Sequence, residues 1–363
     1  MNKAKKIAVK IGSNVLTRSD GTLDITRMSA LVDQVAELRH AGFSIVLISS
    51  GAVASGRSEM ACRQRLDPVS ARQLYSAVGQ AKLINRYYEF FRDHGITCGQ
   101  VLTMKESFST RMEYLNQKHC MEVMLENDVI PIVNENDTVS VTELMFTDND
   151  ELSGLIATML GMDTLVILSN VDGVYDGDPS SPQASLIREI KQNTVFDETM
   201  LAGNAKSSYG RGGMETKFRI ARKVADEGIS VVIANGKRDN ILTDIILHRR
   251  DVPHTVFTAA VRPVSSVKKW IAHSEDFAKG VIHVNQGAYE ALVSTHANSL
   301  LPVGIVRIDG EFEKDDIVRI ASPDGRIFAV GRTAYDSREA RSIAGKQGKK
   351  PIVHYNYLFI EQS

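Results

Sequence analysis

The chain has 363 residues, which at ~150 residues per domain predicts two domains rather than one small module. Apolar residues make up 43% and charged residues 24% of the chain, so disordered, collagenous and coiled-coil classes are excluded. Forty-three Lys and Arg residues against 44 Asp and Glu residues leave a net charge of -1, so no global field recruits nucleic acid or a membrane surface.

The sequence is typical of a protein of the cytoplasm. The three cysteines, Cys62, Cys98 and Cys120, are widely spaced and odd in number, as expected of reduced thiols in a core. After the charged N-terminus, Lys10 and Gly12 interrupt the apolar stretch, which is too short for a signal peptide. No run approaches the ~18 apolar residues that a membrane-spanning helix needs. We therefore expect a cytoplasmic protein with no membrane contact.

Five short runs rich in β-branched residues predict strands that are buried on both faces. They occupy residues 6–11, 43–49, 129–133, 164–168 and 229–233. Between them, apolar residues recur with helical spacing, for example over 26–41, and a helix is also expected at 151–160. This alternation predicts an α/β fold, a three-layer sandwich with a mainly parallel central sheet. Ligands of such folds bind where loops leave the carboxyl ends of the strands.

The pattern changes after about residue 260. From residue 303 the chain contains short alternating segments, separated by the pairs Asp309-Gly310 and Asp324-Gly325, which are typical of hairpin turns. These segments predict a small β-rich domain. The expected organisation is a catalytic domain over 1–260, a linker over 261–277 and the small domain over 278–363.

A basic stretch lies within the small domain. Residues 326–350 hold seven Lys and Arg side chains against two acidic ones. Such a run is more often a solvated face, and RNA binding is the alternative. The seven basic residues are Arg326, Arg332, Arg338, Arg341, Lys346, Lys349 and Lys350.

The motifs of Walker-type NTPases, Rossmann dehydrogenases, zincins and α/β-hydrolases are absent from the sequence. Instead, four loops at expected strand or helix ends carry groups that hold ions. The first loop is Lys10 to Asn14, where a lysine in an apolar strand needs an anionic partner and Gly12 lets phosphate approach. Its alternative interpretation is a snorkelling lysine on an edge strand.

The second and third loops follow the second strand and the strand at 129–133. The sequence SSGAVASG, over 49–56, combines small residues that could receive an anion, although a close helix crossing also needs small residues. The loop over 134–150 gathers carboxylates and amides, which need a cation among them: Mg²⁺, a lysine or a substrate amino group. The alternative is an exposed acidic loop with ordinary turns and a helix cap. Its members are Asn134, Glu135, Asn136, Asp137, Glu143, Asp148, Asn149 and Asp150.

The fourth loop, Gly210 to Lys217, feeds glycines into a helix that carries a lysine in its first turns. This arrangement supplies an anion cradle and a mobile positive charge. Two lysines, acidic residues between them in sequence and glycine-rich anion loops together predict a phosphoryl-transfer site that lacks a P-loop.

The six phrases KIGSNVL, SSGAVASG, PIVNENDTV, TDNDELSGLIA, NVDGVYDGDP and GRGGMETK, in this order, resemble the amino acid kinase family. The phrases GVIHVNQGAYEAL, SLLPVGI and ARSIAG resemble a PUA domain. The resemblance implies ATP-dependent phosphorylation, with Mg²⁺, of the L-glutamate side-chain carboxylate to L-glutamyl 5-phosphate, the first step of proline biosynthesis. It also implies feedback inhibition by proline. A homo-oligomer is expected, and the reactivity of the acyl phosphate product favours hand-over to glutamyl phosphate reductase.

The same resemblance assigns roles to individual residues. Lys10 and Lys217 would hold the transferred phosphoryl group, and Asp150 would orient both ammonium groups. Direct ligands of Mg²⁺ stay unassigned. The expected glutamate site consists of Ser50, Asn134, Asp137, Asp148 and Asn149. The expected ATP site consists of Lys10, Gly12, Ser169, Asn170, Arg211, Gly212, Gly213, Met214, Glu215, Thr216 and Lys217.

One pair departs from the family pattern. The family usually has Thr-Asp where this chain has Ser169-Asn170, which puts the nucleotide contact there in doubt.

Two rival functions are a sibling kinase acting on acetylglutamate, aspartate, carbamate or UMP, and an RNA-binding protein with a vestigial kinase part. The small domain and the NEND loop argue against the first, and the intact Lys10, Asp150 and Lys217 argue against the second.

Overall fold

The computed structural model describes part of the chain, and its contacts divide that chain into two compact units. The described residues are 5–360 apart from 61–65, 140–148, 180, 182, 193, 195–212, 261–269, 272–273 and 295–297. The first unit comprises Met1–Lys105 and Asn116–Pro263, and the second comprises Glu106–Leu115 and Val264–Ser363. The second unit thus takes a short segment from the middle of the sequence. The predicted boundaries at 260 and 278 stay a prediction.

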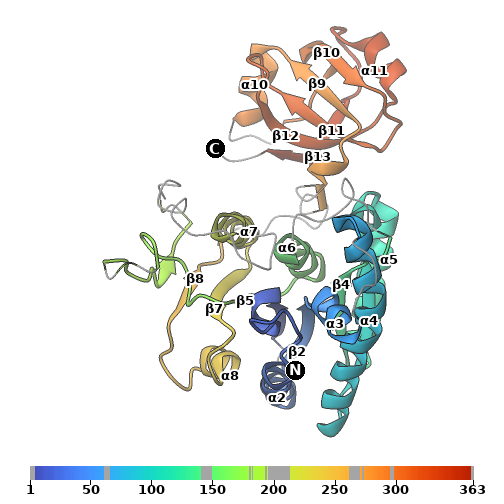
Figure 1. The fold of residues 1–363 in the computed structure, drawn as a ribbon. Coiled ribbons are helices and arrows are strands. Elements are labelled where there is room, and N and C mark those ends of the chain that lie inside the picture. Colours follow the sequence, from blue (N-terminus) through green and yellow to red (C-terminus); the bar gives the residue numbers. More distant parts are fainter. Residues whose placement is uncertain are drawn as a thin grey trace. The chain divides into compact units, whose positions relative to one another are not determined.

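The first unit is built around one sheet, and the strands described there run in the order β3-β4-β2-β1-β5-β7-β8-β6 (Figure 1). Neighbouring strands are parallel except β7 and β8, which are antiparallel. The strands are β1 (Lys6–Ile11), β2 (Ser44–Ser49), β3 (Thr97–Thr103), β4 (Val129–Glu135), β5 (Thr164–Ser169), β6 (Glu189–Ile190), β7 (Ser230–Asn235) and β8 (His254–Phe257).

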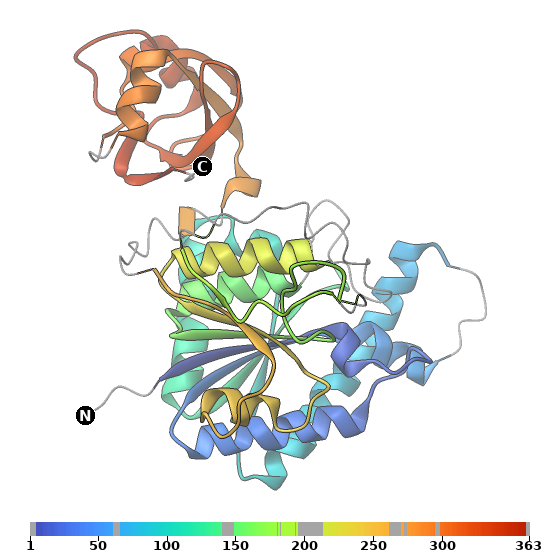
Figure 2. The same cartoon turned by 90° about the vertical axis from the view of Figure 1, so that its left-hand side faces the viewer.

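Helices cover both faces of this sheet. In Figures 1 and 2, α6 and α7 lie over one face and α2 and α8 over the other. Side chains of α2, α4 and α8 share one apolar core with β1, β2 and β5. The helical segments in chain order are α1 (Ser13–Leu16), α2 (Ile25–His40), α3 (Ala52–Glu59), α4 (Pro68–Asp93), the 3-10 turn η1 (Lys105–Phe108), α5 (Arg111–Glu126), α6 (Asn149–Leu160), α7 (Met214–Asp226) and α8 (Ile241–Ile246).

Local sequence signals explain where these helices begin. The Asp24 side chain accepts a hydrogen bond from the backbone N–H of Arg27 at the start of α2. Asp67 does the same for two N–H groups of α4, whose first residue is Pro68. Both are ordinary N-cap devices, and proline at the first helical position loses no intrahelical bond.

The expected three-layer α/β sandwich is confirmed, and the five predicted strands correspond to β1, β2, β4, β5 and β7. Lys10 pairs across β1 with Ile48 of β2 and Ile167 of β5, so it lies in the interior of the sheet. The edge-strand interpretation of this lysine is therefore wrong. A lysine in such a place must have an ionic partner.

Among the described residues, the second unit contains a sheet with the strand order β10-β9-β11-β12-β13. Neighbouring strands there are antiparallel, except that β9 and β11 are parallel. Its core includes Ile282, Val318 and Phe328. The elements are η4 (Glu275–Phe277), β9 (Gly280–Val284), α10 (Gln286–Val293), η5 (Pro302–Gly304), β10 (Ile305–Gly310), β11 (Ile317–Ala321), β12 (Ile327–Thr333), α11 (Ser337–Ile343) and β13 (Val353–Ile360).

One of the two predicted hairpin turns is correct. Asp324 and Gly325 lie between the antiparallel strands β11 and β12, and Gly325 has a φ of +87°. The prediction for Asp309 and Gly310 is wrong, because both belong to β10, which pairs with β9 instead of β11. Turn dipeptides mark bends, but they do not say which strands pair.

The basic stretch is partly neutralised by acidic residues outside it. Arg332 Nη1 lies 3.3 Å from Asp315 Oδ1, and Arg341 Nη1 lies 2.8 Å from Glu311 Oε1. These ion pairs favour the interpretation of a solvated face. Across the described residues, no helix is both long and apolar enough to cross a membrane.

The cysteines do not all lie in a core. Cys98 is buried, and burial raises the pKa of its thiol to about 12. Cys120 is exposed, so the prediction of a core thiol is wrong there, and Cys62 lies outside the described residues.

Candidate active site

Three side chains from distant parts of the sequence meet beyond the carboxyl end of β1. Lys10 comes from β1, Asp150 from the first turn of α6 and Lys217 from the first turn of α7. Lys10 Nζ lies 2.5 Å from Asp150 Oδ1, and Lys217 Nζ lies 3.0 Å from Asp150 Oδ2. The three residues are 4%, 1% and 8% exposed, respectively. The structure therefore gives each lysine its own oxygen of one buried carboxylate.

This group carries a net positive charge. Burial opposes ionisation of Asp150, but the ammonium groups of Lys10 and Lys217 outweigh burial and hold the pKa of the carboxyl below its usual range. Two ammonium groups and one carboxylate bring one more positive than negative charge into a place with little water. Such a site favours an anion with several oxygens, and a phosphoryl group in transfer is one.

Gly12 lies next to Lys10 at a position where a side chain would not fit. A Cβ at this position would lie 2.9 Å from the carbonyl oxygen of Leu168 and 3.5 Å from Lys10 Nζ. The N–H of Gly12 donates to that same carbonyl at 3.0 Å, so it is engaged within the sheet. Gly12 therefore acts by the side chain it lacks, because its own N–H is used within the sheet.

Polar side chains at the ends of β2 and β4 meet at the start of α6. The amide nitrogen of Asn149 donates to Ser50 Oγ at 2.8 Å and to Asn134 Oδ1 at 3.1 Å. Asn134 is itself buried at 5% exposure. The structure thus joins three of the residues expected to bind glutamate into one hydrogen-bonded group next to Asp150.

Asp137 lies in a second polar cluster, which the sequence analysis did not foresee. Arg72 on α4 donates through Nη2 to Asp137 Oδ1 and, at 3.1 Å, to Glu135 Oε2. Both carboxylates are buried. Burial raises the pKa of Asp137, and the nearby Arg72 guanidinium only partly opposes this rise. Sequence spacing gave no signal for Arg72, which is 65 residues away from Asp137.

Apart from Lys10 and Gly12, the expected nucleotide residues that the structure describes fall into two places in the first unit. Ser169 and Asn170 lie at the carboxyl end of β5, where Ser169 is paired with Asn235 of β7. Gly213 caps the start of α7, and Met214, Glu215, Thr216 and Lys217 form its first turn. Three expected site residues lie outside the described residues: Asp148, Arg211 and Gly212.

Next to Ser169 is a further ion pair that the sequence analysis missed. Arg238 holds Asp172 through two hydrogen bonds of 2.7 Å, and Asn235 donates to the same carboxylate at 3.1 Å. The pKa of Asp172 is lowered mainly by the hydrogen bonds from Arg238. This pair fixes the loop that follows Asn170.

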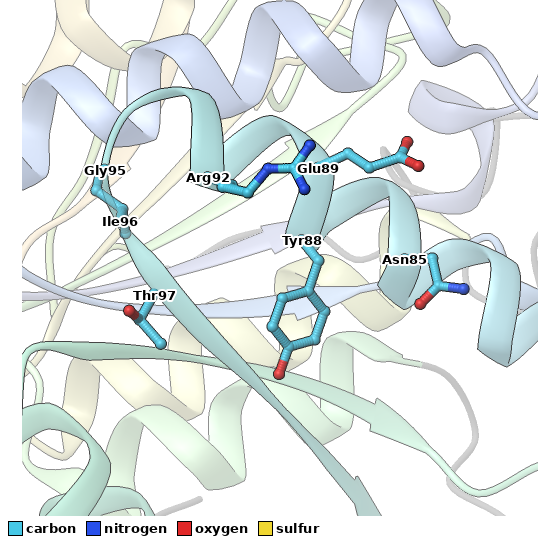
Figure 3. A pocket seen from close by; sticks show the side chains of 7 residues that line it. All are labelled: Asn85, Tyr88, Glu89, Arg92, Gly95, Ile96 and Thr97. Atoms are coloured by element: carbon cyan, nitrogen blue, oxygen red, sulfur yellow. The ribbon is translucent and has the colours of Figure 1, made fainter.

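A surface cavity of about 390 Å³ lies elsewhere, where α4 ends and β3 begins (Figure 3). None of the residues predicted for the site lines it. Its lining residues are Asn85, Tyr88, Glu89, Arg92, Gly95, Ile96 and Thr97.

Comparisons with known proteins agree with this geometry. The model of the amino acid kinase family matches residues 5–235, and that of the PUA domain matches residues 280–355. The chain is 65% identical to a glutamate 5-kinase from Bacteroides thetaiotaomicron, with 98% of both chains covered. It is 45% identical to a glutamate 5-kinase from Chlorobaculum tepidum, with 98% of this chain and 97% of the relative covered.

Among solved structures, the chain is similar to a carbamate kinase from Giardia lamblia bound to AMP-PNP, with a TM-score of 0.50 and 17% identity. That similarity covers 72% of this chain and 100% of the other, and it concerns the fold alone. The sequence matches extend further, through the C-terminal residues as well. The chain, which also carries a PUA domain, therefore belongs to the glutamate 5-kinases of the amino acid kinase family.

Proposed function

We propose that this protein transfers the γ-phosphoryl group of ATP to the side-chain carboxylate of L-glutamate, forming L-glutamyl 5-phosphate and ADP. The reaction is the first step of proline biosynthesis. The observation that carries the proposal is the buried group in which Lys10 and Lys217 share Asp150. The relatives of this protein from Bacteroides thetaiotaomicron and Chlorobaculum tepidum, both named glutamate 5-kinase, support glutamate as the acceptor.

The acceptor needs no general base. A glutamate side chain with a pKa of ~4.3 is ionised at neutral pH, so one carboxylate oxygen can attack the γ-phosphorus directly. A carboxylate oxygen–phosphorus bond forms while the bond from the γ-phosphorus to the bridging β–γ oxygen breaks, and ADP leaves with that oxygen and its electron pair. The main obstacle is repulsion between two anions, because carboxylate and polyphosphate must come together.

The two lysines reduce that repulsion. Their ammonium groups face the place where negative charge spreads over the equatorial oxygens of the transferred group. Asp150 keeps both ammonium groups in position before any substrate arrives, so the lysines need no reorganisation during transfer. Asp150 is thus an orienting residue, and both of its oxygens are used for this purpose.

The groups around β2 and β4 are suited to hold the amino acid end of glutamate. Ser50 and Asn149 offer a hydroxyl and an amide next to Asp150, within one hydrogen-bonded group. Asp137 offers a carboxylate for the substrate ammonium group, as a charge-assisted hydrogen bond. Asp148 is proposed for the same site on the family resemblance.

The site also suits ATP, which supplies the phosphoryl group when bound. The start of α7, which carries Lys217, supplies N–H groups with a favourable dipole for the phosphates. The described residues include no group of three or more side chains that could hold a metal ion. Mg²⁺, when bound with ATP, would neutralise part of the charge on the phosphate oxygens, and no step here depends on a protein ligand to it.

Substitution of either lysine tests the assignment. Removing one positively charged group that stabilises the transition state should lower kcat by ~10²–10³-fold in Lys10→Ala and in Lys217→Ala. The measurement is hydroxamate formation from ATP, glutamate and hydroxylamine. Lys191→Ala is the matched control, because that side chain is 70% exposed, and it should retain full activity.

Near-normal turnover in Lys10→Ala or Lys217→Ala would refute the proposed site. A comparison of glutamate with acetylglutamate, aspartate, carbamate and UMP in an ADP-release assay separates this function from that of a sibling kinase. Preference for one of the other acceptors would leave the phosphoryl-transfer site intact and change the substrate.

Several finer points stay proposals from the resemblance. Proline should inhibit hydroxamate formation, and the same assay with added proline tests this. The product is a reactive acyl phosphate, so direct hand-over to glutamyl phosphate reductase is favourable, and crosslinking with that enzyme tests it. A homo-oligomer and a cytoplasmic location are proposed as well, the latter supported by the free thiols of Cys98 and Cys120. RNA binding by the PUA domain stays an untested alternative.

A further inference from the structure

A buried chain of hydrogen bonds connects α4 to the turn that follows β2. Tyr87 Oη, from α4, lies 2.7 Å from Ser49 Oγ, and both residues are 0% exposed. Ser49 Oγ in turn donates to the backbone carbonyl of Ser50 at 3.0 Å. The chain therefore ends on the backbone of Ser50, a residue expected to bind glutamate.

The direction of these hydrogen bonds follows from the hydrogens available. A serine hydroxyl has one hydrogen, and that of Ser49 is used at the Ser50 carbonyl. The hydrogen between Tyr87 and Ser49 must therefore come from the phenol. Burial raises the pKa of Tyr87, so the phenol keeps this hydrogen at neutral pH. Tyr87 is thus the donor that starts the chain, and it sets the direction in which the Ser49 hydroxyl points.

Ser50 is held at three of its polar groups. Its backbone N–H donates to the carbonyl of Ile11 at 3.2 Å, its own carbonyl accepts from Ser49, and its Oγ accepts from the amide of Asn149 at 2.8 Å. A hydroxyl oxygen that accepts from an amide still carries its own hydrogen, which it can donate to a carboxylate oxygen of the acceptor. With its backbone held, Ser50 offers that hydrogen in a defined direction.

We propose that Tyr87 is a positioning residue of the acceptor site, which acts through Ser49 to hold Ser50 in the orientation that binds glutamate. The inference rests on the proposed function, because it takes Ser50 to contact the acceptor. Tyr87 acts through two hydrogen bonds in series and not on the reacting atoms. Without the phenol hydrogen, the Ser49 hydroxyl loses the donor that directs it, and the Ser50 carbonyl loses a fixed partner.

The kinetic effect of this role is selective. Ser50 would contact glutamate before and during phosphoryl transfer alike, because it lies at the acceptor and not at the transferred group. Loss of such uniform binding raises the KM for glutamate and leaves kcat unchanged. Damage to the sheet in general would change kcat and the KM values of both substrates together.

The experiment measures ADP release by the full-length protein and by Tyr87→Phe, with glutamate and ATP varied in turn. Phenylalanine keeps the ring that stacks on Phe91, with 6.2 Å between ring centres, and removes only the hydroxyl. We expect the KM for glutamate to rise about 3–10-fold, as for one lost hydrogen bond, with less than about twofold change in kcat and in the KM for ATP. Tyr88→Phe is the matched control at the next residue, which is 48% exposed, and it should behave as the unaltered protein.

A double-mutant cycle tests the route through Ser49. Ser49→Ala breaks the same chain one step closer to the site, so it should raise the KM for glutamate at least as much as Tyr87→Phe does. If Tyr87 acts through Ser49, then adding Tyr87→Phe to Ser49→Ala should change this KM by less than about twofold. Thermal melting by circular dichroism checks the fold of each variant, and Ser49→Ala carries the test if Tyr87→Phe does not fold.

Three results in folded variants would overturn the inference while phosphoryl transfer to glutamate stands. They are an unchanged KM for glutamate, a loss spread equally over kcat and both KM values, and a Tyr87→Phe effect that adds in full to that of Ser49→Ala. Unaltered protein that releases no ADP with glutamate would refute the proposed function instead.

Discussion

Gly12 shows how a missing side chain can serve a reaction. A Cβ there would press on the carbonyl of Leu168 at 2.9 Å, and backbone of a central strand cannot move aside cheaply. The same Cβ would come within 3.5 Å of Lys10 Nζ. The glycine therefore protects the backbone position from which the lysine reaches Asp150.

Gly12→Ala should consequently affect activity more than stability. We expect a loss of about 1–3 kcal/mol in the free energy of unfolding from overpacking. Displacement of Lys10 should lower kcat by about 10–100-fold, since small shifts of catalytic groups are costly. Urea denaturation and the hydroxamate assay measure the two effects. Gly177→Ala is the control, because a Cβ there would meet nothing closer than 3.9 Å.

The pKa values of the two buried carboxylates, Asp137 and Asp150, are shifted in opposite directions. Burial raises the pKa of Asp137, whereas Lys10 and Lys217 hold the pKa of Asp150 below its usual range in spite of burial. The stability that Asp150 contributes is present above its unfolded pKa and is lost only as the pH falls through its lower folded pKa. As the pH is lowered, Asp137 therefore takes up a proton before Asp150 does.

The KM for glutamate should accordingly rise as the pH is lowered, while kcat stays unchanged. Protonation of Asp137 removes the charge that pairs with the substrate ammonium, and it begins at a higher pH than for an ordinary aspartate of pKa ~3.9. Initial rates between pH 5 and 8 measure this. Asp137→Asn should give a high KM that no longer depends on pH, and a pH dependence that persists in this variant would assign the titration to another group.

At the scale of elements, α3 and α4 touch backbone to backbone. A Cβ at Gly79 would lie 1.8 Å from the carbonyl of Ala52, and one at Gly56 would lie 1.9 Å from the carbonyl of Tyr75. Gly56 thus serves a close helix crossing, the structural alternative considered for the SSGAVASG loop. Gly51 differs, because its φ of +112° caps α3 in a conformation that favours glycine.

Gly79→Ala should force these helices apart. We expect a loss of at least about 1–3 kcal/mol in the free energy of unfolding, together with a raised KM for glutamate because α4 carries Arg72. Gly287→Ala in α10 is the matched control, where a Cβ would meet only Asn285 Oδ1 at 3.7 Å. There the gain in helix propensity should stabilise the protein by up to ~1 kcal/mol. A stable Gly79→Ala variant with normal KM would contradict the importance of this crossing.

The elements that sequence reasoning found are those that are buried on both faces. β1 and β5 read as continuous apolar runs because helices cover both sides of them. β3 was missed because it is an edge strand, half exposed and interrupted by Gly99 and Gln100. β8 has only four residues, too few to carry a period.

The same limit applies to the site. Lys10, Asp150 and Lys217 could be foreseen because each is a polar residue that a strand or helix end brings to one edge of the sheet. Arg72 could not, because a partner 63 or 65 residues away leaves no local pattern. Only the packing of α4 on the loop after β4 brings Arg72 there.

At the scale of the whole molecule, the second unit does not consist of one continuous stretch of chain. Its C-terminal part is joined by Glu106–Leu115, a segment that follows β3 and runs from η1 into the first residues of α5. Trp270, the single tryptophan, is 2% exposed, and its Nε1–H donates to the carbonyl of Phe108 at 3.1 Å. Arg111 lies 5.7 Å from the centre of the indole ring and adds a cation–π contact.

Trp270→Phe should therefore weaken both parts of that unit together. The substitution keeps an aromatic ring and removes the indole N–H, so we expect a loss of about 1–3 kcal/mol in the free energy of unfolding. Tyr355→Phe, at a side chain that is 38% exposed, is the control and should change the free energy of unfolding by less than ~0.5 kcal/mol.

Hydrogen exchange shows which segments lose stability in Trp270→Phe. Amides of 106–115 should exchange faster along with those of β9 to β13, because a segment that belongs to a cooperative unit opens when that unit opens. Unchanged exchange over 106–115 in the variant would mean that this segment is stabilised by the first unit instead, in spite of its contact with Trp270.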